Sequence, residues 1–313
     1  MNCVILARLF LSHTRRTVIC SNLFSKMSGK TDIVLSSSWF NKYVADEDSP
    51  EGVFRGLSDR FSGITVDSNR ETCKSEEFSE TLQRSLSYWI TKNKRGIWFK
   101  VNLSCSHWVP ELVHNQFKFH HAKDDFVMLY RWLPKDEEPN IPPYAHTMVG
   151  VGAIVMNNQN QILVVNEKHA LIKGSWKLPG GYVEPDENFV DAAIREVNEE
   201  TNIKTRFESL VSIRHAHSAG FGCSDLYIVM ALIPESMEIK KCDREIDKCM
   251  WMSVDDYLIH PEIHETNRNF LRTYLEYKKM GLKISCKNEV HQILKKQYNI
   301  YSLDCSQNKS STL

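Results

Sequence analysis

One stretch, residues 181–203, constrains the fold of this chain most because it places several glutamates at helical spacing. At about 100° per residue, Glu196, Glu199 and Glu200 fall within one arc of about 100° on a helix. Carboxylates this close repel one another, and their natural partner is Mg²⁺ or Mn²⁺, which prefers oxygen ligands and often shares them with substrate phosphates. A separate flank of the same helix is apolar and can be buried: Val190, Ile194 and Val197.

An isolated acidic run is most often a solvated helix face, but this run belongs to a longer pattern. Gly181 is followed after five residues by Glu187, and after seven more by the sequence Arg-Glu-Val-Asn-Glu-Glu at 195–200. This spacing matches the Nudix box, so the chain resembles the Nudix hydrolases. A chance match at six fixed positions is of the order of one in ten million per starting point.

The resemblance implies roles for particular residues. It makes Glu196, Glu199 and Glu200 ligands of Mg²⁺ or Mn²⁺, and it makes Glu187 and Arg195 a pair that steadies the box. The implied substrate is a small nucleotide, a nucleoside diphosphate linked to another moiety, which is cleaved by metal-assisted attack of water on phosphorus. The implied fold is α/β, the Nudix α/β/α sandwich with a mixed sheet between helices.

The residues around the box refine this prediction. Asn202 stands where the family usually has glycine, and asparagine tolerates a left-handed helix end better than other non-glycine residues. Residues 176–181 resemble the usual lead-in, in which glycines permit a turn of the backbone against the metal site. Pro185 and Asp186 predict the start of the helix.

A general base would complete the catalytic machinery. Glu245 is the candidate, although a surface carboxylate on a loop is the simpler interpretation, and Glu196 or Glu187 are alternatives. Substrate contacts are predicted in the region 214–227, where aromatic rings can stack on a base and histidines can meet phosphate. An equally open interpretation is that these residues only complete a strand and a turn: His215, His217, Phe221 and Asp225.

Substrate choice depends on features outside the box. A similarity to plant members of the family favours ADP-ribose or NADH. An alternative is an RNA enzyme that removes a nucleotide cap, for which a modest basic stretch gives weak support: Lys92, Lys94, Arg95 and Lys100. A third hypothesis is a regulatory or binding module with weak hydrolysis, although such modules typically lose the glutamates that this chain retains.

The chain has 313 residues, about twice the length of a typical domain, so two domains are expected. Its 39 basic and 39 acidic residues balance, so no global basic field indicates nucleic acid. The nine cysteines form no CxxC pair and no zinc-type cluster, which predicts reduced thiols in an intracellular protein. No apolar run approaches the roughly 18 residues of a membrane span. A homodimer is left open.

Residues 1–31 have arginines and lysines but no acidic residue, which predicts a mitochondrial targeting segment. An unstructured basic extension is the alternative. Met27 offers a second start, which would leave a cytoplasmic or nuclear form.

Residues 32–133 predict a smaller α/β domain, similar to the domain that precedes the Nudix domain in an animal member of the family and its plant relatives. Ser106 is expected to cap its second helix. Adjacent strand residues point to opposite faces, which predicts that one of His120 and His121 is packed and the other exposed. The expected elements are a helix at 78–91, a strand at 96–101, a helix at 106–115 and strands at 117–121 and 124–133.

The proline-rich, charged segment 134–144 is the predicted linker to a Nudix domain at 145–285. The last segment, 286–313, is predicted to form an amphipathic helix at 287–296 and a disordered tail. The Nudix domain is expected to contain a strand pair at 146–156 and 161–166 around a turn, strands at 205–217, 226–232 and 247–252, and a helix at 261–280.

Overall fold

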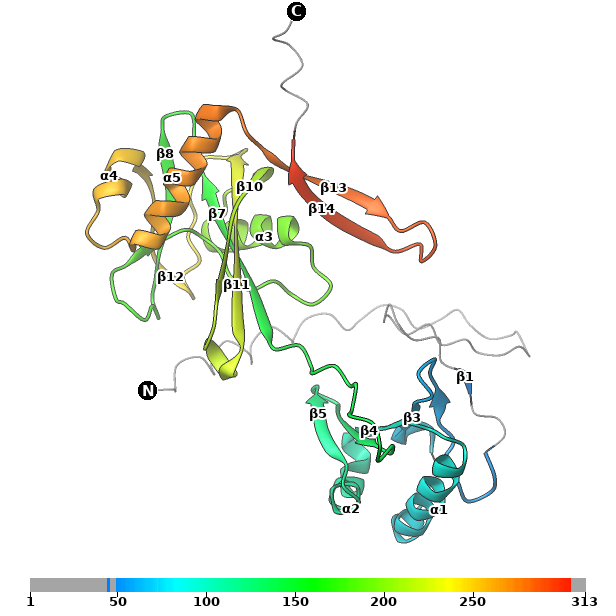
Figure 1. The fold of residues 1–313 in the computed structure, drawn as a ribbon. Coiled ribbons are helices and arrows are strands. Elements are labelled where there is room, and N and C mark those ends of the chain that lie inside the picture. The colour runs from blue at the N-terminus through cyan, green and yellow to red at the C-terminus, as the bar shows by residue number, and fades with distance from the viewer. Residues whose placement is uncertain (1–43, 46–48, 72, 305–313) are drawn as a thin grey trace, which may run out of the picture. The chain divides into compact units, whose positions relative to one another are not determined.

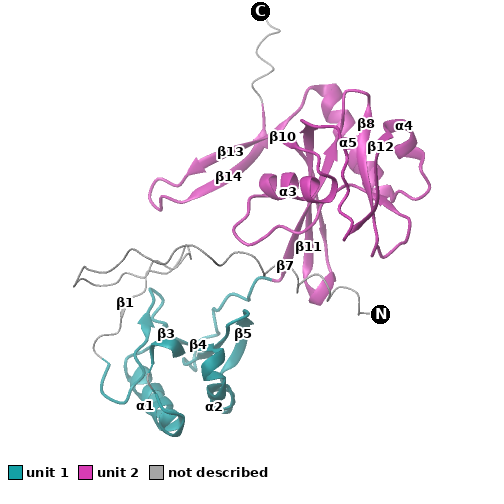
Figure 2. Cartoon of the chain, turned by 180° about the vertical axis from the view of Figure 1, so that it is seen from behind, with its two compact units in different colours: residues 1–145 teal, residues 146–313 magenta. Residues whose placement is uncertain are grey.

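The computed structural model describes residues 44–45, 49–71 and 73–304 (Figure 1). The chain forms two compact units, residues 1–145 and 146–313, which are considered separately (Figure 2). The boundary falls at the end of the predicted linker. The predicted targeting segment, the alternative start at Met27 and most of the predicted disordered tail lie outside the described residues.

The first unit is built on a six-stranded sheet with the order β1-β2-β3-β4-β6-β5. Strands β3 and β4 run parallel and the other neighbours are antiparallel. The sheet is therefore mixed, as expected of an α/β domain. Its strands are β1 (Val44–Ala45), β2 (Leu57–Ser58), β3 (Ile64–Asp67), β4 (Gly96–Asn102), β5 (Lys118–Ala122) and β6 (Phe126–Trp132).

Two helices cover this sheet. The helix α1 (Phe78–Thr91) has the predicted bounds. The helix α2 (Val109–His114) follows a 3-10 segment, Leu103–Trp108. The prediction that Ser106 caps the second helix is wrong, because Ser106 lies inside the 3-10 segment and Trp108 occupies the N-cap position.

Aromatic rings fill the core of the first unit. The buried side chain of Phe99 on β4 lies 5.4 Å from the ring centroid of Phe54 and 5.3 Å from that of Phe117. Phe78, the first residue of α1, stacks on Trp108 at 4.6 Å. Because each ring removes a large apolar area from water, these contacts join the helices to the sheet.

The two adjacent histidines of β5 do not behave as predicted. A bulge lies between Phe119 and His121, so the alternation of faces is interrupted. The Nδ1 atoms of His120 and His121 are 2.7 Å apart, and both side chains are partly buried. The predicted linker packs here, since His120 Nε2 donates to the carbonyl of Pro142 at 2.9 Å and Tyr144 stacks on His121 at 4.5 Å.

The second unit contains two sheets. The larger has the order β14-β13-β10-β11-β7, and the smaller has the order β12-β8-β9. Strands β7 and β11 are parallel, whereas the other neighbours are antiparallel. The strands are β7 (Thr147–Val155), β8 (Gln161–Glu167), β9 (Trp176–Lys177), β10 (Thr205–Ala216), β11 (Ser224–Pro234), β12 (Ile246–Ser253), β13 (Ile284–Val290) and β14 (Gln297–Leu303).

Helices lie on both sides of these sheets. The helix α3 (Phe189–Thr201) packs on one side. The helices α4 (Val254–Ile259) and α5 (Glu265–Met280) pack on the other. The predicted α/β/α sandwich with a mixed sheet is confirmed.

Two local predictions in this unit are wrong. The strands β7 and β8 flank the predicted turn but enter different sheets, and an isolated bridge between Met156 and Ile162 links their ends. The region 287–296 is not helical, because it holds the end of β13 and the turn into β14. Its apolar residues are exposed instead of forming a buried stripe, and Ile293 is 84% exposed. The larger sheet therefore extends beyond residue 285.

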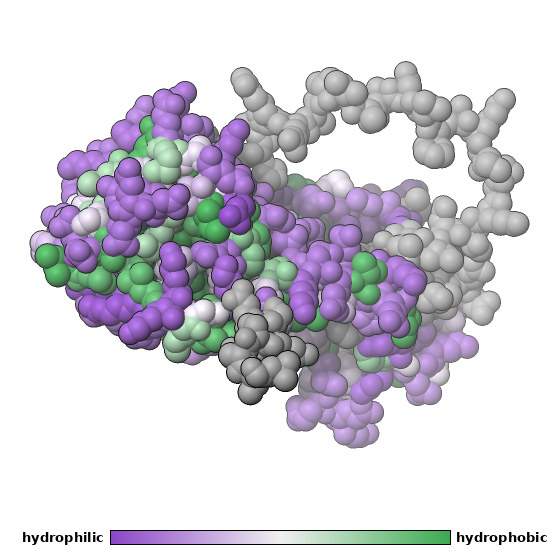
Figure 3. All heavy atoms as spheres, turned by 90° about the horizontal axis from the view of Figure 1, so that it is seen from above, coloured by the Kyte–Doolittle hydropathy of each residue, from purple (hydrophilic) through white to green (hydrophobic). Residues whose placement is uncertain are grey.

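The visible surface is mainly hydrophilic, with smaller hydrophobic groups between (Figure 3). Among the described residues, no helix is both long enough and apolar enough to cross a membrane.

Candidate active site

The turn at 176–181 brings the backbone close to both β7 and α3. Gly180 has φ of +153°, and a Cβ atom there would lie 2.1 Å from the carbonyl oxygen of Val151. A Cβ on Gly181 would lie 2.5 Å from Oε1 of Glu196. At Gly180 the clash is with backbone atoms, so glycine is required there, whereas a Cβ at Gly181 would displace the end of the Glu196 side chain from its place beside the turn.

The helix α3 carries the box. It ends at Asn202, which has φ of 62° and donates its N–H to the carbonyl of Asn198 at 2.8 Å, so the predicted left-handed end is confirmed. The predicted start at Pro185 and Asp186 is wrong, because Asp186 has φ of 62° and α3 begins three residues later. The apolar flank packs into the core as predicted, through Val190, Ile194 and Val197.

The three glutamates share one arc of α3 but lie at different depths. Glu200 is 2% exposed, and its Oε2 accepts a hydrogen bond from the N–H of Gly180 at 3.0 Å. The side chain of Glu196 is 14% exposed, whereas that of Glu199 is 60% exposed. Two of the three carboxylates are therefore withdrawn from water beneath the glycine turn.

One guanidinium joins most of these carboxylates. Arg195 donates from Nε and Nη2 to the two oxygens of Glu187, at 2.7 and 2.8 Å. Its Nη1 donates to Glu196 at 2.9 Å and to Glu199 at 3.3 Å. The bidentate contact fixes the plane of the guanidinium, so Glu187 and Arg195 form the pair that the sequence pattern implies.

The surroundings of the carboxylates shift their pKa values in opposite directions. Hydrogen bonds from Arg195 lower the pKa of the Glu187 carboxylate, so Glu187 is a poor proton acceptor. Burial raises the pKa of Glu196, and the charges of Glu199 and Glu245 add to the rise. Burial also raises the pKa of Glu200 to about 7. For both buried carboxylates, burial outweighs the nearby positive charge, which comes from Arg195 at Glu196 and from Lys177 at Glu200.

The candidate base Glu245 comes from the smaller sheet. Pairing of β8 with β12 places Ile246 opposite Glu167, and the N–H of Lys168 donates to the carbonyl of Glu245 at 2.9 Å. The side chain of Glu245 is exposed, and its charge acts on the pKa of Glu196. Strand pairing thus brings Glu245 within electrostatic reach of the box.

Two further residues at this site were given no role by the sequence pattern. Lys177 on β9 pairs with Glu167 on β8 at 2.6 Å. Lys177 lowers the pKa of Glu200 and Glu167 raises it, so both lie near the buried carboxylate. Their positions in the sequence were the one indication that they belong to the site. Lys177 lies in the glycine lead-in, and Glu167 follows the predicted strand 161–166.

Three of the four predicted substrate residues lie at the exposed end of the β10–β11 hairpin. The rings of His215 and His217 are 4.6 Å apart, and His217 Nδ1 lies 3.0 Å from Ser224 Oγ. Phe221 is 69% exposed at the tip, with φ of 59°. No contact in the described residues joins these three to the box glutamates.

The fourth, Asp225, has a different environment. It accepts a hydrogen bond from Arg214 at 2.5 Å, and the Arg214 guanidinium lies 4.9 Å from the ring centroid of Tyr227. Burial raises the pKa of Tyr227, and the charges of Glu200 and Arg214 both act on it. Arg214 is thus a cation held in place beside the ring of Tyr227, in an arrangement that the sequence pattern did not reveal.

Comparisons with known proteins agree with this geometry. A family model described as the NUDIX domain matches residues 146–274, and one described as the Nudix hydrolase domain matches residues 54–133. Nudix hydrolase 2 of Arabidopsis thaliana is 36% identical over 66% of this chain and 74% of its own length. The chain belongs to the Nudix hydrolase family.

Other relatives show how far the likeness extends. Nudix hydrolase 8 of Arabidopsis thaliana is 37% identical over 66% of this chain, but the chain spans only 56% of that protein. Nucleoside diphosphate-linked moiety X motif 6 of Homo sapiens is 37% identical over 64% of this chain and 66% of its own length. A solved NUDIX hydrolase from Nitrosomonas europaea is 26% identical, with a TM-score of 0.38 over 42% of this chain and 90% of its own.

Nudix hydrolases generally need a divalent metal ion, and the donor chemistry of this site fits one. Its donors are carboxylate oxygens, and a cation beside Glu196 and Glu200 would offset their desolvation. Among the residues that the structure describes, no three acidic, histidine or cysteine side chains are already gathered to hold an ion. Arg195 Nη1 contacts Oε1 of Glu196 and Oε2 of Glu199, so it occupies one oxygen of each carboxylate and orients both groups.

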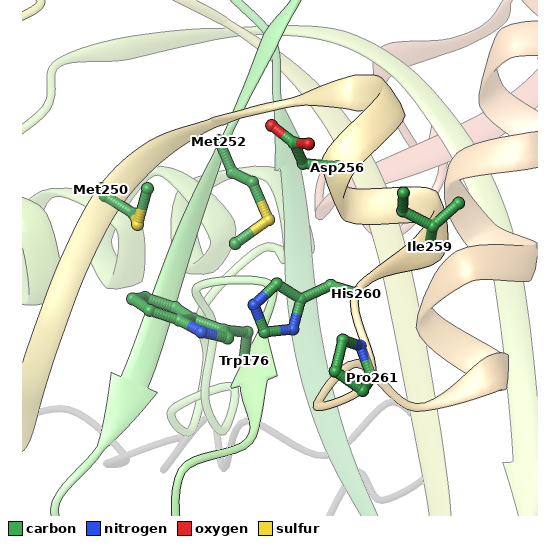
Figure 4. Close-up of a pocket in the computed structure, with 7 residues that line it drawn as sticks. All are labelled: Trp176, Met250, Met252, Asp256, Ile259, His260 and Pro261. Carbon is green, nitrogen blue, oxygen red and sulfur yellow. The ribbon is translucent and has the colours of Figure 1, made fainter.

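A separate hollow of about 400 Å³ lies over the smaller sheet (Figure 4). Trp176 on β9 lines it, whereas the next residue, Lys177, pairs with Glu167. Adjacent strand residues point to opposite faces, so the sheet separates this hollow from the carboxylates. Its other lining residues are Met250, Met252, Asp256, Ile259, His260 and Pro261.

The basic stretch that suggested RNA is largely engaged within the first unit. Arg95 pairs with Glu137 at 2.5 Å and lies over the Trp132 ring. Lys100 pairs with Asp67 at 3.4 Å. Paired side chains have less charge to offer a phosphate backbone, so the geometry adds nothing to the cap-removal hypothesis.

Proposed function

We propose that this chain is a Mg²⁺- or Mn²⁺-dependent pyrophosphohydrolase that cleaves a nucleoside diphosphate linked to another moiety, with ADP-ribose or NADH-like compounds as substrates. The observation that carries the proposal is the pair of carboxylates withdrawn from water, Glu196 and Glu200, beneath the glycine turn at 180–181. Buried carboxylates lacking compensating charge are typical of a binding site, because they cost stability in the absence of a ligand.

The bound metal would neutralise the diphosphate and polarise the attacked phosphoryl group. Glu196, Glu199 and Glu200 would hold it. Arg195, fixed by Glu187, sets the direction of Glu196 and Glu199.

Glu245 is the proposed proton acceptor, since its side chain is exposed and its charge raises the pKa of Glu196. Glu187 is a weaker candidate because Arg195 occupies both of its oxygens. Arg214 is proposed to orient the diphosphate, since Asp225 and the Tyr227 ring hold its guanidinium in place. The similarity to plant relatives supports the substrate class, whose members share a diphosphate joined to adenosine.

A nucleotide panel tests this proposal. The full chain is assayed with ADP-ribose, NADH, dinucleoside polyphosphates and capped RNA, each with Mg²⁺ and with Mn²⁺. Faster turnover of ADP-ribose or NADH than of the other compounds is expected, with loss of turnover in Glu245→Gln and Glu200→Gln. Preference for capped RNA, or turnover in EDTA, would contradict the proposal.

A further inference from the structure

The hairpin formed by β13 and β14 lies beyond residue 274, where the match to the NUDIX domain ends. It joins the larger sheet at its base, where Ile284 pairs with Leu210 and the N–H of Ile284 donates to Ser209 Oγ at 3.0 Å. From there it runs past α3 (Figure 1). An anchored hairpin in this place can act on the start of the box helix.

Two side chains of β14 contact that start directly. Asn299 Nδ2 donates to Oδ1 of Asn188 at 2.9 Å. The Tyr301 ring stacks on Phe189, the first residue of α3, at 6.1 Å and 22°. Asn288 holds Asn299 from the opposite strand, by a 3.0 Å hydrogen bond from its Nδ2 to Oδ1 of Asn299. The contact is thus part of a connected set of side chains.

The start of α3 lacks the usual local support. Asn188 occupies the N-cap position, but its side chain accepts no hydrogen bond from the first N–H groups of the helix. Its Nδ2 donates to Asp191 at 2.8 Å, and its Oδ1 is used by Asn299. A long-range contact therefore takes the place of a local cap at this end.

The same point of the chain controls the carboxylates. Glu187 directly precedes Asn188, and it fixes Arg195 through two hydrogen bonds. Arg195 in turn holds Glu196 at 2.9 Å. A shift of residues 187–189 would be transmitted to Glu196 through this guanidinium.

We propose that the β13–β14 hairpin, through Asn299 and Tyr301, positions the start of α3 and the Glu187–Arg195 pair, and so sets the affinity of the carboxylates for a divalent cation. Asn299 and Tyr301 are positioning residues, since they act through Asn188 and Phe189 at the start of α3. This inference rests on the proposed function in one respect, the identity of the carboxylates as metal ligands.

The test uses the full chain and two measurements. Mn²⁺ affinity is read from the electron paramagnetic resonance signal of the free ion, and amide hydrogen exchange at 186–195 is read without metal. Asn299→Ala and Tyr301→Leu are each expected to weaken Mn²⁺ binding about tenfold, the effect typical of residues that orient metal ligands, and to speed exchange at 186–195.

A matched control lies on the same strand. Tyr298→Phe removes a 2.9 Å hydrogen bond from the Tyr298 hydroxyl to Glu289, a residue of β13 and not of α3, so Mn²⁺ affinity and exchange at 186–195 are expected to stay at the wild-type values. A double-mutant cycle of Asn188→Ala and Asn299→Ala is expected to be non-additive, because the two side chains share one hydrogen bond.

Two outcomes would overturn the positioning role: unchanged exchange at 186–195 in both β14 variants, or equal effects in Tyr298→Phe. Failure of the proposed function has a different signature. If wild type and Glu200→Gln bind Mn²⁺ equally, the carboxylates are not the metal site, and the exchange comparison alone then decides whether the hairpin positions α3.

Discussion

The two units of this protein are both α/β, yet their interiors differ in kind. The first unit is filled by rings such as Phe54, Phe99 and Trp108, and the polar residues buried there are neutral. The second unit has a mainly aliphatic core and buries Glu200. Burial of apolar surface stabilises a fold, whereas burial of a carboxylate opposes folding unless a partner offsets it. A buried carboxylate in the second unit is what a ligand-binding site requires, whereas the described part of the first unit buries only groups that stabilise the fold or carry no charge.

Charge pairing shows the same contrast. In the first unit Arg95 faces Glu137, and Lys100 faces Asp67, in one-to-one pairs. In the second unit the single cation Arg195 contacts three carboxylates. The surplus negative charge lies beneath the glycine turn, where a divalent cation would balance it.

The largest effect is expected from removing a central ring of the first unit. Phe99→Ala should lower the free energy of unfolding of this unit by about 3 to 5 kcal/mol, because it removes a fully buried ring that contacts several others. Denaturant unfolding measures this loss. Metal-dependent turnover below the transition should persist, and its disappearance would show that the catalytic unit depends on the first core.

The charged interior is tested by Glu200→Gln, which keeps size and helix propensity but removes a charge. Turnover at limiting Mg²⁺ should fall by about 10²-fold or more, the scale of one missing electrostatic group. The variant should melt no lower than wild type in EDTA, because it relieves a desolvation cost. If Glu200→Gln retains wild-type turnover, Glu200 is not a catalytic metal ligand.

The pH dependence of stability sharpens the comparison. The folded pKa of Glu200 is raised to about 7, above its ordinary value of 4.5, so its contribution is fully present below about 4.5 and is lost as the pH rises through 7. In EDTA, the stability difference between wild type and Glu200→Gln should therefore change by no more than about 3 kcal/mol between pH 5 and pH 8. Urea unfolding at several pH values measures it, and a flat difference would contradict the burial of this charge.

The smallest effect is expected on the apolar flank of α3. Val197→Ala should lower the free energy of unfolding by about 1 to 2 kcal/mol, through lost burial and a small cavity. Thermal melting detects the loss, while turnover at 25 °C should match wild type. If turnover instead falls as far as in Glu200→Gln, the two faces of α3 are not functionally distinct.

The sequence by itself determined the box helix, its apolar flank and the left-handed end at Asn202, because these depend on spacing along a few turns of one chain segment. It also indicated the glycine turn. The start of the helix was misplaced by three residues, since Asp186 adopts a left-handed conformation and a contact from residue 299 replaces the local cap.

Only the tertiary structure decided which carboxylates are buried and which side chains join them. Glu196, Glu199 and Glu200 are alike in sequence, but the glycine turn covers two and leaves Glu199 in water. Pairing of β8 with β12 places Ile246, the neighbour of Glu245, opposite Glu167, and a bulge in β5 brings the rings of His120 and His121 together. Residues 287–290 became strand through pairing with residues 297–300 of β14, in a hairpin that joins β10 where Ile284 pairs with Leu210. Cross-strand partners such as Glu167 and Ile246, or Leu210 and Ile284, are separated by many residues, and their pairing is set by burial and strand register across the fold, which no local pattern encodes.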